Sequence, residues 1–244
     1  MRILAFDSST PSTAVGVMLE DGTVLSAYDH PEAGARPGHQ TRLLPLAAEL
    51  LESAELDWRA IDRVGVGLGP GTYTGLRVGV ASARSLAQSL GTEIVGVSSS
   101  EALARAALRA TKEPDAGLQR AVITVVDARR GEVFVGAYGA SASRVSAIRA
   151  PGPLSLSEAA PELARIVSDH PCDAWLAVGD GVLALREELA RVEVEAAPAG
   201  SALHDVDARA LCELARDAES QPLEAVVPVY CRAPDAELAL AGAR

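Results

Sequence analysis

The chain has 244 residues, of which 48% are hydrophobic, so it is long enough to bury one large core or two smaller ones, and a disordered chain is excluded. Its 22 Lys and Arg residues against 33 Asp and Glu residues give a formal net charge of −11, the opposite of what a protein needs to bind nucleic-acid phosphates on its own. The three cysteines, Cys172, Cys212 and Cys231, have no Cys-x-x-Cys spacing, which is typical of a reducing compartment rather than of a disulfide framework.

The N-terminal residues predict a β-meander rather than a targeting segment. The apolar run 3–6 is too short for a signal peptide. No later run reaches membrane-spanning length without charges or breakers, so we expect a cytoplasmic protein without a membrane contact. Strands are expected at 3–6, 13–19 and 23–28. Asp21-Gly22 between the last two is a strong signal for a hairpin turn.

Two helices with broad apolar faces follow the meander. Residues 39–54 place apolar side chains around more of the helix than a one-sided surface helix needs. Residues 74–90 form the second helix, in which Gly75, Gly79 and Ala83 stack four residues apart. Glycine within a helix costs roughly 1 kcal/mol relative to alanine. The strip therefore predicts close packing, either against the chain's own sheet or against a partner.

A glycine-rich turn precedes the second helix. It reads Gly69-Pro70-Gly71-Thr72 and follows an expected strand at 64–68. Free backbone N–H groups at a helix start are a physically sound place for a phosphate. The turn is not a Walker A loop, because no Gly-Lys-Ser/Thr follows. A tight structural turn accounts for the same residues equally well.

A unit of the first meander recurs later in the chain. The unit is a strand closed by an aspartate and followed, at the same spacing, by a Val-Gly pair. It occurs with Asp7, Val15 and Gly16 and again with Asp127, Val135 and Gly136. This predicts a duplicated lobe, with the polar stretch 110–119 as the joint. We expect an N-terminal lobe at 1–109, completed by part of 205–244, and a C-terminal lobe at 110–204.

The remaining segments alternate between strands and helices. Ser98 and Glu101 form a capping box that opens a helix to about residue 109. Other strands are expected at 93–97, 123–127, 133–138 and 175–178, and other helices at 157–168, 182–191 and 206–218. Strands and helices in this order predict an α/β fold with mixed sheets.

Several segments together resemble the TsaB family, also called YeaZ. They follow the family's order along nearly the whole chain: Asp7-Ser8-Ser9, Ala14-Val15-Gly16, 39–45, 69–79, 127–133 and 228–232. The segment 69–79, GPGTYTGLRVG, is specific to TsaB and to its catalytic paralogue TsaD. The resemblance implies an actin-like ATPase (ASKHA) fold, an α/β architecture with two ribonuclease-H-like lobes and mixed sheets.

TsaD carries a metal-binding His-x-x-x-His pair that this chain lacks. The corresponding stretch, 97–104, contains no histidine. The chain's histidines have no ligand spacing either: His30, His39, His170 and His204. Metal chemistry needs imidazoles or carboxylates at such spacing. We therefore expect a TsaB-type chain with no metal site and no catalytic residue.

The resemblance further implies a dimerisation or scaffold subunit, required for the threonylcarbamoyladenosine (t6A) modification at adenosine 37 of tRNA. Such a subunit docks a TsaD-like catalytic subunit in a heterodimer, with a TsaE-like ATPase as third partner and a homodimer as an option for the isolated chain. tRNA contact, ATP and a metal are expected only in the assembled complex, and no cofactor in this chain. The docking helices would be 39–54 and 74–90, with these contact residues: Leu43, Leu44, Ala47, Leu51, Gly75, Leu76, Gly79, Val80 and Ala83.

Two enzyme alternatives stay open. An actin-like-fold ATPase or small-molecule kinase would bind nucleotide between the lobes, with a strand-end aspartate for Mg²⁺ and glycine turns for phosphates. The residues concerned, remnants in the TsaB family, are Asp7, Gly69, Gly71, Thr72, Gly179 and Gly181. An M22-type glycoprotease-like peptidase is less favoured, because no Gly-x-Ser-x-Gly motif marks a nucleophile.

Overall fold

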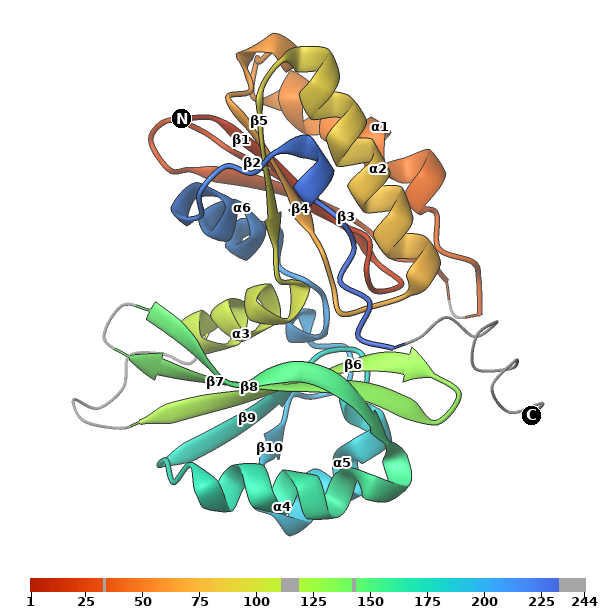
Figure 1. Cartoon of the computed structure of the whole chain (residues 1–244), viewed down its shortest axis with the longest axis vertical. Helices are drawn as coiled ribbons and strands as arrows, with labels where there is room; N and C mark the ends of the chain where they lie inside the picture. Colours follow the sequence, from red (N-terminus) through yellow and green to blue (C-terminus); the bar gives the residue numbers. More distant parts are fainter. Residues whose placement is uncertain (33, 111–118, 142–143, 233–244) are drawn as a thin grey trace.

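The chain folds into two lobes, each built on a five-stranded mixed sheet (Figure 1). The computed structural model describes residues 1–32, 34–110, 119–141 and 144–232. The first sheet has the order β3-β2-β1-β4-β5, with β1 (Ile3–Asp7), β2 (Thr13–Met18), β3 (Val24–Asp29), β4 (Arg63–Gly67) and β5 (Glu93–Val97). The second has the order β10-β9-β6-β7-β8, with β6 (Arg120–Arg129), β7 (Glu132–Ser141), β8 (Arg144–Ser155), β9 (Ala174–Val178) and β10 (Glu195–Ala196).

The shared strand order confirms the predicted duplication. Each sheet begins with an antiparallel meander of three strands, β1-β2-β3 in the first and β6-β7-β8 in the second. On the other side of the meander's first strand, two further strands pair in parallel: β4 and β5 in the first sheet, β9 and β10 in the second. The two Val-Gly pairs, however, are not in equivalent register. Val15 lies opposite Phe6, one residue before that strand's aspartate, whereas Val135 lies opposite Val125, two residues before its aspartate. The first hairpin contains one more residue than the second, so the equal spacing is a coincidence.

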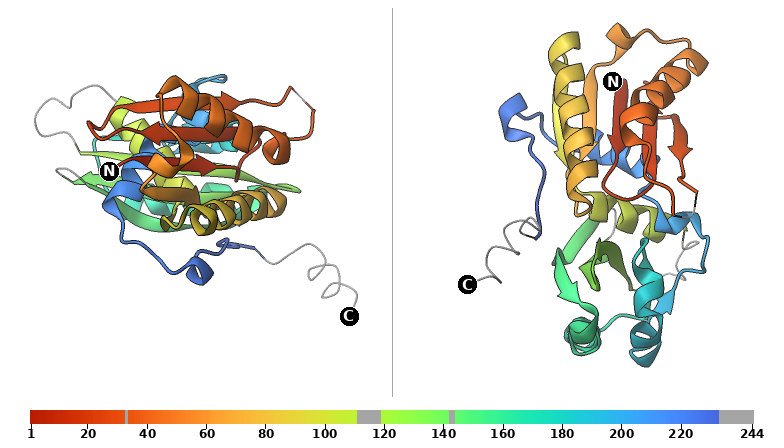
Figure 2. Two further views of the ribbon diagram at one scale, coloured as in Figure 1. Left: turned by 90° about the horizontal axis from the view of Figure 1, so that it is seen from above. Right: turned by 90° about the vertical axis from the view of Figure 1, so that its right-hand side faces the viewer.

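Helices cover both outer faces and fill the space between the sheets. The outer face of the first sheet carries α1 (His39–Ser53) and α2 (Tyr73–Leu90) (Figure 1, Figure 2). The space between the sheets holds α3 (Ser99–Ala110) and α6 (Ala208–Asp217). The outer face of the second sheet carries α4 (Ala159–Asp169) and α5 (Arg186–Arg191). Short 3-10 helices occupy Trp58–Ala60, Leu156–Glu158, Val182–Leu185, Ala202–His204 and Leu223–Ala225. Buried apolar side chains accordingly form three layers, with α3 and α6 in the central one.

Most predicted elements lie within two residues of their expected positions. Asp21-Gly22 joins β2 to β3, and both docking helices are present. The Ser98 half of the expected capping box is confirmed, because the Ser98 hydroxyl accepts a hydrogen bond from the Glu101 N–H at 3.2 Å, whereas the Glu101 carboxylate pairs with Arg105. The helix expected at 182–191 is instead a 3-10 turn followed by the short α5.

The central strands of the first sheet are covered on both faces. Every residue of β1, β2 and β4 is buried, which is why they read as nearly continuous apolar runs. The charged exceptions are Asp7 at the end of β1 and Arg63 at the start of β4. The Arg63 guanidinium donates to the backbone oxygens of Ala215 (2.7 Å) and Ala218 (2.8 Å) at the end of α6. Its other nitrogens donate to the Glu93 carboxylate. Arg63 thus fixes α6 to the sheet by satisfying helix-end carbonyl groups.

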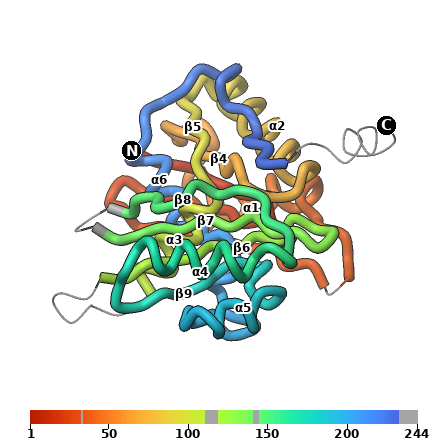
Figure 3. The backbone as a smooth tube through the Cα atoms, turned by 60° about the horizontal axis from the view of Figure 1, so that its bottom comes forward, coloured from red at the N-terminus to blue at the C-terminus, as the bar shows by residue number. Residues whose placement is uncertain are grey.

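After α6 the chain returns along the first lobe as residues 219–232, called the C-terminal segment below. The Val229 N–H donates to the Leu68 oxygen at 2.9 Å. Arg232 then reaches the second lobe and pairs with the carboxylate of Glu132. Figure 3 shows the segment passing beside β5 and α2. The segment therefore lies against the first lobe and is tied to the second at its end.

Some expectations are left open by the described residues. Most of the expected joint at 110–119 lies outside them. No helix that they form is long and apolar enough to cross a membrane. The division of the chain at residues 109 and 204 stays a prediction.

Candidate docking face and glycine turn

The glycine-rich turn is packed against the loop after β1. The Thr72 N–H donates to the Ser9 oxygen at 2.7 Å. A side chain on Gly71 would place its Cβ 2.3 Å from that same oxygen, and one on Gly75 would place it 1.9 Å from the Ser8 oxygen. These two glycines are therefore needed because two backbone segments touch.

Some of the amide groups in the glycine turn and at the start of α2 are engaged within the chain. Thr72 is the N-cap residue, and its hydroxyl accepts a hydrogen bond from the Gly75 N–H at 3.3 Å. The Gly69 N–H donates to the Ser99 hydroxyl at 3.1 Å, and Gly69 has a φ of 110°, which favours glycine. Tight packing, the structural alternative considered above, accounts for this turn without a phosphate.

Asp7 is enclosed beneath this turn. Its carboxylate has no exposed surface and accepts hydrogen bonds from the Ser9 N–H (2.7 Å), the Ser9 hydroxyl (2.6 Å) and the Ser99 hydroxyl (2.5 Å). A Cβ on Gly67 would lie only 1.7 Å from the carboxylate. Burial raises the pKa of Asp7, although the hydrogen bonds from Ser9 and Ser99 act in the opposite direction. Asp7 thus holds three segments together inside the lobe.

The second glycine turn belongs to the other lobe. Gly179 has a φ of 108° and abuts Val125, and the Asp180 carboxylate between the two glycines accepts the Asp127 N–H at 3.0 Å. Gly181 packs against the same strand end. Burial raises the pKa of Asp180 to about 6. The six residues expected to be remnants of a nucleotide site therefore fall into two groups. Asp7, Gly69, Gly71 and Thr72 make their contacts within the first lobe, and Gly179 and Gly181 pack against β6 of the second lobe.

The start of α1 is tied to β2 by a buried imidazole. The His39 Nδ1 lies 2.8 Å from the Thr13 hydroxyl, and His39 is 5% exposed. Burial lowers the pKa of His39. The His39 imidazole therefore packs in the interior and fixes the start of α1 to β2.

Most of the residues expected to dock a partner lie beneath the surface of α1 and α2. Eight of the nine are buried in this chain: Leu43, Ala47, Leu51, Gly75, Leu76, Gly79, Val80 and Ala83. A Cβ on Gly79 would lie 2.6 Å from the Ser8 hydroxyl and 3.6 Å from Val66. Both the apolar stripe and the small-residue strip thus face the chain's own sheet. Of the nine, Leu44 is 44% exposed, and Val80, although buried, lines the groove between α2 and residues 228–230.

Different residues on the same helices form the outer face. Ala81 and Ser85 are exposed on α2. One groove separates them from α1 and is lined by Leu44, Ala81, Ser82, Ser85, Leu86 and Ser89. A second groove, called the C-terminal groove below, lies between α2 and the C-terminal segment, where Pro228 and Tyr230 form the far wall. The exposed ridge of α2 is therefore flanked by grooves on both sides.

An aromatic cluster that the sequence did not reveal lies at one end of the C-terminal groove. The rings of Tyr73 and Tyr230 stack with centroids 4.8 Å apart, and the guanidinium carbon of Arg77 lies 3.8 Å from the Tyr73 centroid. The Arg77 Nε donates to the Tyr230 hydroxyl at 2.8 Å. Both tyrosines are about 40% exposed. Tyr230 is 153 residues from Arg77, so no local pattern could have found the cluster.

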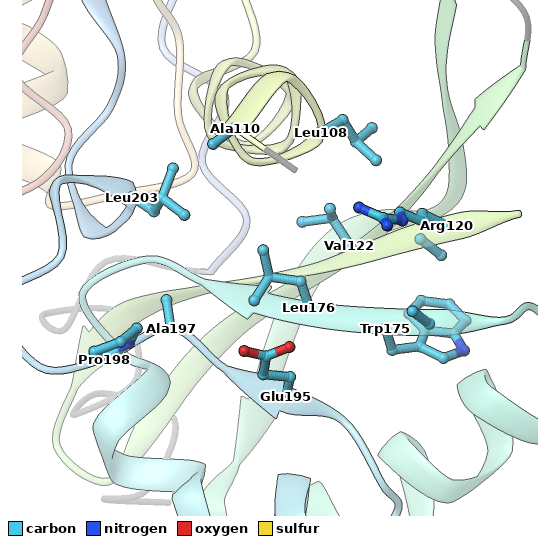
Figure 4. Close-up of a pocket in the computed structure, with 12 residues that line it drawn as sticks. Leu108, Ala110, Arg120, Val122, Trp175, Leu176, Glu195, Ala197, Pro198 and Leu203 are labelled. Atoms are coloured by element: carbon cyan, nitrogen blue, oxygen red, sulfur yellow. The ribbon is translucent and has the colours of Figure 1, made fainter. Parts of the chain in front are cut away.

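A separate cavity lies in the second lobe, between the end of α3 and strands β6, β9 and β10 (Figure 4). Its walls are mainly aliphatic, with Leu108, Val122, Leu176 and Leu203 among them. None of the site residues expected from the sequence lines it.

Comparison with known proteins identifies the family. Residues 29–240 match the family model described as TsaD, tRNA N6-adenosine threonylcarbamoyltransferase. The tRNA threonylcarbamoyladenosine biosynthesis protein TsaB of Bacillus subtilis (strain 168) is 36% identical over 138 residues, which cover 57% of this chain and 55% of the relative. The protein of the same name from Escherichia coli (strain K12) is 35% identical over 138 residues, with the same coverage. The matched part spans about half the length of these curated relatives.

Solved structures agree with this result. YeaZ from Pseudomonas aeruginosa matches with a TM-score of 0.75 and 28% identity, covering 94% of this chain and 99% of that chain. EutJ from Carboxydothermus hydrogenoformans (TM-score 0.51, 12% identity) and a ROK family glucokinase from Streptomyces griseus (TM-score 0.50, 13% identity) share the fold alone. The predicted actin-like α/β fold with two mixed-sheet lobes is thereby confirmed. On the family model, the curated relatives and the YeaZ structure together, the chain belongs to the TsaB (YeaZ) family.

Proposed function

We propose that the chain is a non-catalytic scaffold subunit for the t6A modification at adenosine 37 of tRNA and that it docks a TsaD-like catalytic subunit. The observation that carries the proposal is the outer face of α1 and α2, where Ala81 and Ser85 form an exposed ridge between two grooves. Helices pack by setting ridges into grooves. The two grooves beside this ridge can therefore receive the ridges of helices from a second subunit.

The enclosed position of Asp7 supports a role without nucleotide chemistry. A carboxylate that holds Mg²⁺ needs a lone pair open to the ion and to its water ligands. Asp7 has no exposed surface, and Ser9 and Ser99 donate to both of its oxygens. The ATPase or kinase alternative would require the Asp7 loop and the glycine turn to separate.

The charge of the chain supports indirect contact with tRNA. A formal net charge of −11 opposes the phosphate contacts that dominate nucleic-acid affinity. We therefore assign tRNA, ATP, a metal ion and a TsaE-like ATPase to the assembled complex rather than to this chain alone. The same outer face would serve a homodimer of the isolated chain.

Reconstitution with the catalytic subunit of the same organism tests the proposal. Size-exclusion chromatography with light scattering should give a stable complex of the two chains. t6A formation should require both, and the chain alone should show no ATP turnover. Modification at the full rate without this chain, or Mg²⁺-dependent ATP turnover by the chain alone, would contradict the scaffold role.

A further inference from the structure

We infer that the C-terminal groove receives an acidic helix of the catalytic subunit, with Arg77 and Arg84 as its charged contacts and the C-terminal segment as its far wall. This inference rests on the proposed docking function and deepens it. The C-terminal segment becomes part of the docking face together with α1 and α2, although the sequence had not connected it with them. The partner's contact helix is expected to be negatively charged.

The groove carries positive charge that no acidic side chain among the described residues neutralises. Helix α2 contains two arginines, Arg77 and Arg84, and no acidic residue, and residues 226–232 contain no acidic residue either. This is notable in a chain with 33 Asp and Glu residues. Arg84 forms no ion pair with any residue that the structure describes. The described partners of Arg77 are the uncharged side chains of Tyr73 and Tyr230.

The two arginines are placed for a helical partner. Both line the C-terminal groove. Seven residues correspond to two turns of a helix, or about 10 Å along its axis, so both side chains lie on one side of α2. The exposed residues beside them on α2 include the small side chains of Ala81, between the two arginines, and Ser85, just after Arg84, which allows a helix backbone to approach closely. Two carboxylates two turns apart on the approaching helix would match this spacing.

The aromatic stack gives Arg77 a defined position before any partner binds. Its guanidinium lies over the ring of Tyr73, and its Nε is held by the Tyr230 hydroxyl. An arginine that is already ordered loses less conformational entropy on binding. Tyrosine and arginine are also the side chains that most often dominate interface energies.

The far wall of the groove is held at several points. Val226 is fully buried in the first lobe, the Val229 N–H is bonded to the Leu68 oxygen, and Arg232 is paired with Glu132 of the second lobe. Between these points the side chains of Val227 and Val229 are about half exposed. The groove itself is lined on this side by Pro228 and Tyr230, and a wall that is preformed in this way suits a protein helix.

RNA is the less suitable occupant. Nucleic-acid binding needs many cationic contacts to phosphates, and this groove offers two arginines on a chain whose net charge is −11.

Charge reversal tests the groove directly. The dissociation constant of the purified chain and the catalytic subunit would be measured by isothermal titration calorimetry at low and at physiological salt. The double variant Arg77→Glu/Arg84→Glu should bind at least about tenfold more weakly. Its salt dependence should be reversed, because salt screens the like-charge repulsion that the two glutamates introduce. Tyr230→Ala should weaken binding as well, because it removes the far wall and the partner of Arg77.

Arg186→Glu is the matched control. Arg186 is exposed on α5 of the second lobe and has no ion pair among the described residues, so its reversal should leave the dissociation constant within about twofold of the original value. Thermal melting of each variant shows whether it is folded. A double variant that is folded and binds like the original chain would overturn the groove assignment while leaving docking itself intact. If the original chain does not bind the catalytic subunit at all, the proposed function fails instead.

Other occupants would give different results, and each would overturn the inference. Loss of self-association in the double variant, with the heterodimer unchanged, would assign the groove to a second copy of this chain. Loss of tRNA binding in a gel-shift experiment, with the heterodimer unchanged, would assign it to RNA. Binding of a synthetic peptide of residues 233–244 to a chain truncated at 232, but not to the truncated double variant, would assign it to this chain's own C-terminal residues.

Discussion

The Asp7 carboxylate lies 2.5 Å from the Ser99 hydroxyl, although the two residues are 92 positions apart in the sequence. This contact joins the end of β1 to the start of α3. In an actin-like enzyme, an aspartate after the first strand would be expected to face a nucleotide. In this chain it faces a serine of its own fold, and this arrangement leads to the first prediction.

Asp7→Asn should keep the fold, whereas Asp7→Ala should lower the free energy of unfolding by about 1–3 kcal/mol, because it leaves buried donors without an acceptor. Burial raises the pKa of Asp7 above its unfolded value. The stability that this group contributes is therefore present below the unfolded pKa and is lost as the pH rises through the folded pKa. The free energy of unfolding of the asparagine variant should accordingly increase relative to that of the original chain as the pH rises. Urea unfolding at pH 4 and pH 8 measures this difference.

Activity of the same asparagine variant separates structure from chemistry. Reconstituted t6A formation should be close to that of the original chain. A folded Asp7→Asn variant that forms the complex but makes no t6A would show that the carboxylate has a chemical role.

Asp180 should make the stability of the chain depend on pH between about 4 and 6. Burial raises its pKa from 3.8 to about 6, so its contribution to stability is complete below pH 3.8 and is lost as the pH rises towards 6. Because the side chain retains some exposure, the loss is expected to be about 1–2 kcal/mol. Asp180→Asn should remove this decline while still accepting the Asp127 N–H. Equal pH profiles for the variant and the original chain would rule out this assignment.

Gly79→Arg should unfold the chain rather than only block docking. Its side chain would enter the space held by the Ser8 hydroxyl and Val66, and even Gly79→Ala should be destabilising, by about 1–3 kcal/mol. Ala81→Arg, two residues away on the exposed side of α2, should change stability by less than about 0.5 kcal/mol and weaken the complex instead. Melting temperatures and co-elution with the catalytic subunit distinguish the two. A stable Gly79→Arg variant would show that this helix is not packed as described.

Arg63→Met should lower the free energy of unfolding by about 2–4 kcal/mol, because it leaves Glu93 and the last carbonyl groups of α6 without their donor. Arg191→Met is a suitable control, since Arg191 pairs with Glu187 on the surface of α5 and such pairs contribute little. Guanidinium unfolding of both variants provides the comparison. A loss below about 0.5 kcal/mol for Arg63→Met would mean that α6 is held by its apolar face alone.

Local patterns predicted the elements of this fold well, and they did so for a physical reason. The Asp21-Gly22 hairpin and the Ser98 cap of α3 depend on groups only a few residues apart. The duplicated meander was predicted from a strand-closing aspartate and an equally spaced Val-Gly pair in each copy. The shared strand order confirms the duplication, although the two Val-Gly pairs proved to be out of register. The family resemblance predicted the actin-like architecture, which the YeaZ structure confirms.

The sequence by itself determined where the strands and helices lie, which residues form the glycine turn, and which family the chain resembles, because turn geometry and helical periodicity act over short distances. It also predicted that Gly75, Gly79 and Ala83 form a closely packed strip, but it could not say what packs there. Periodicity defines a stripe on a helix and carries no information about what covers it. Only the tertiary structure decided that this strip faces the chain's own β1 and β4 and that Ala81 and Ser85 face outward. It alone brought Tyr230 onto Arg77, because a contact between residues this far apart depends on the path of the whole chain between them.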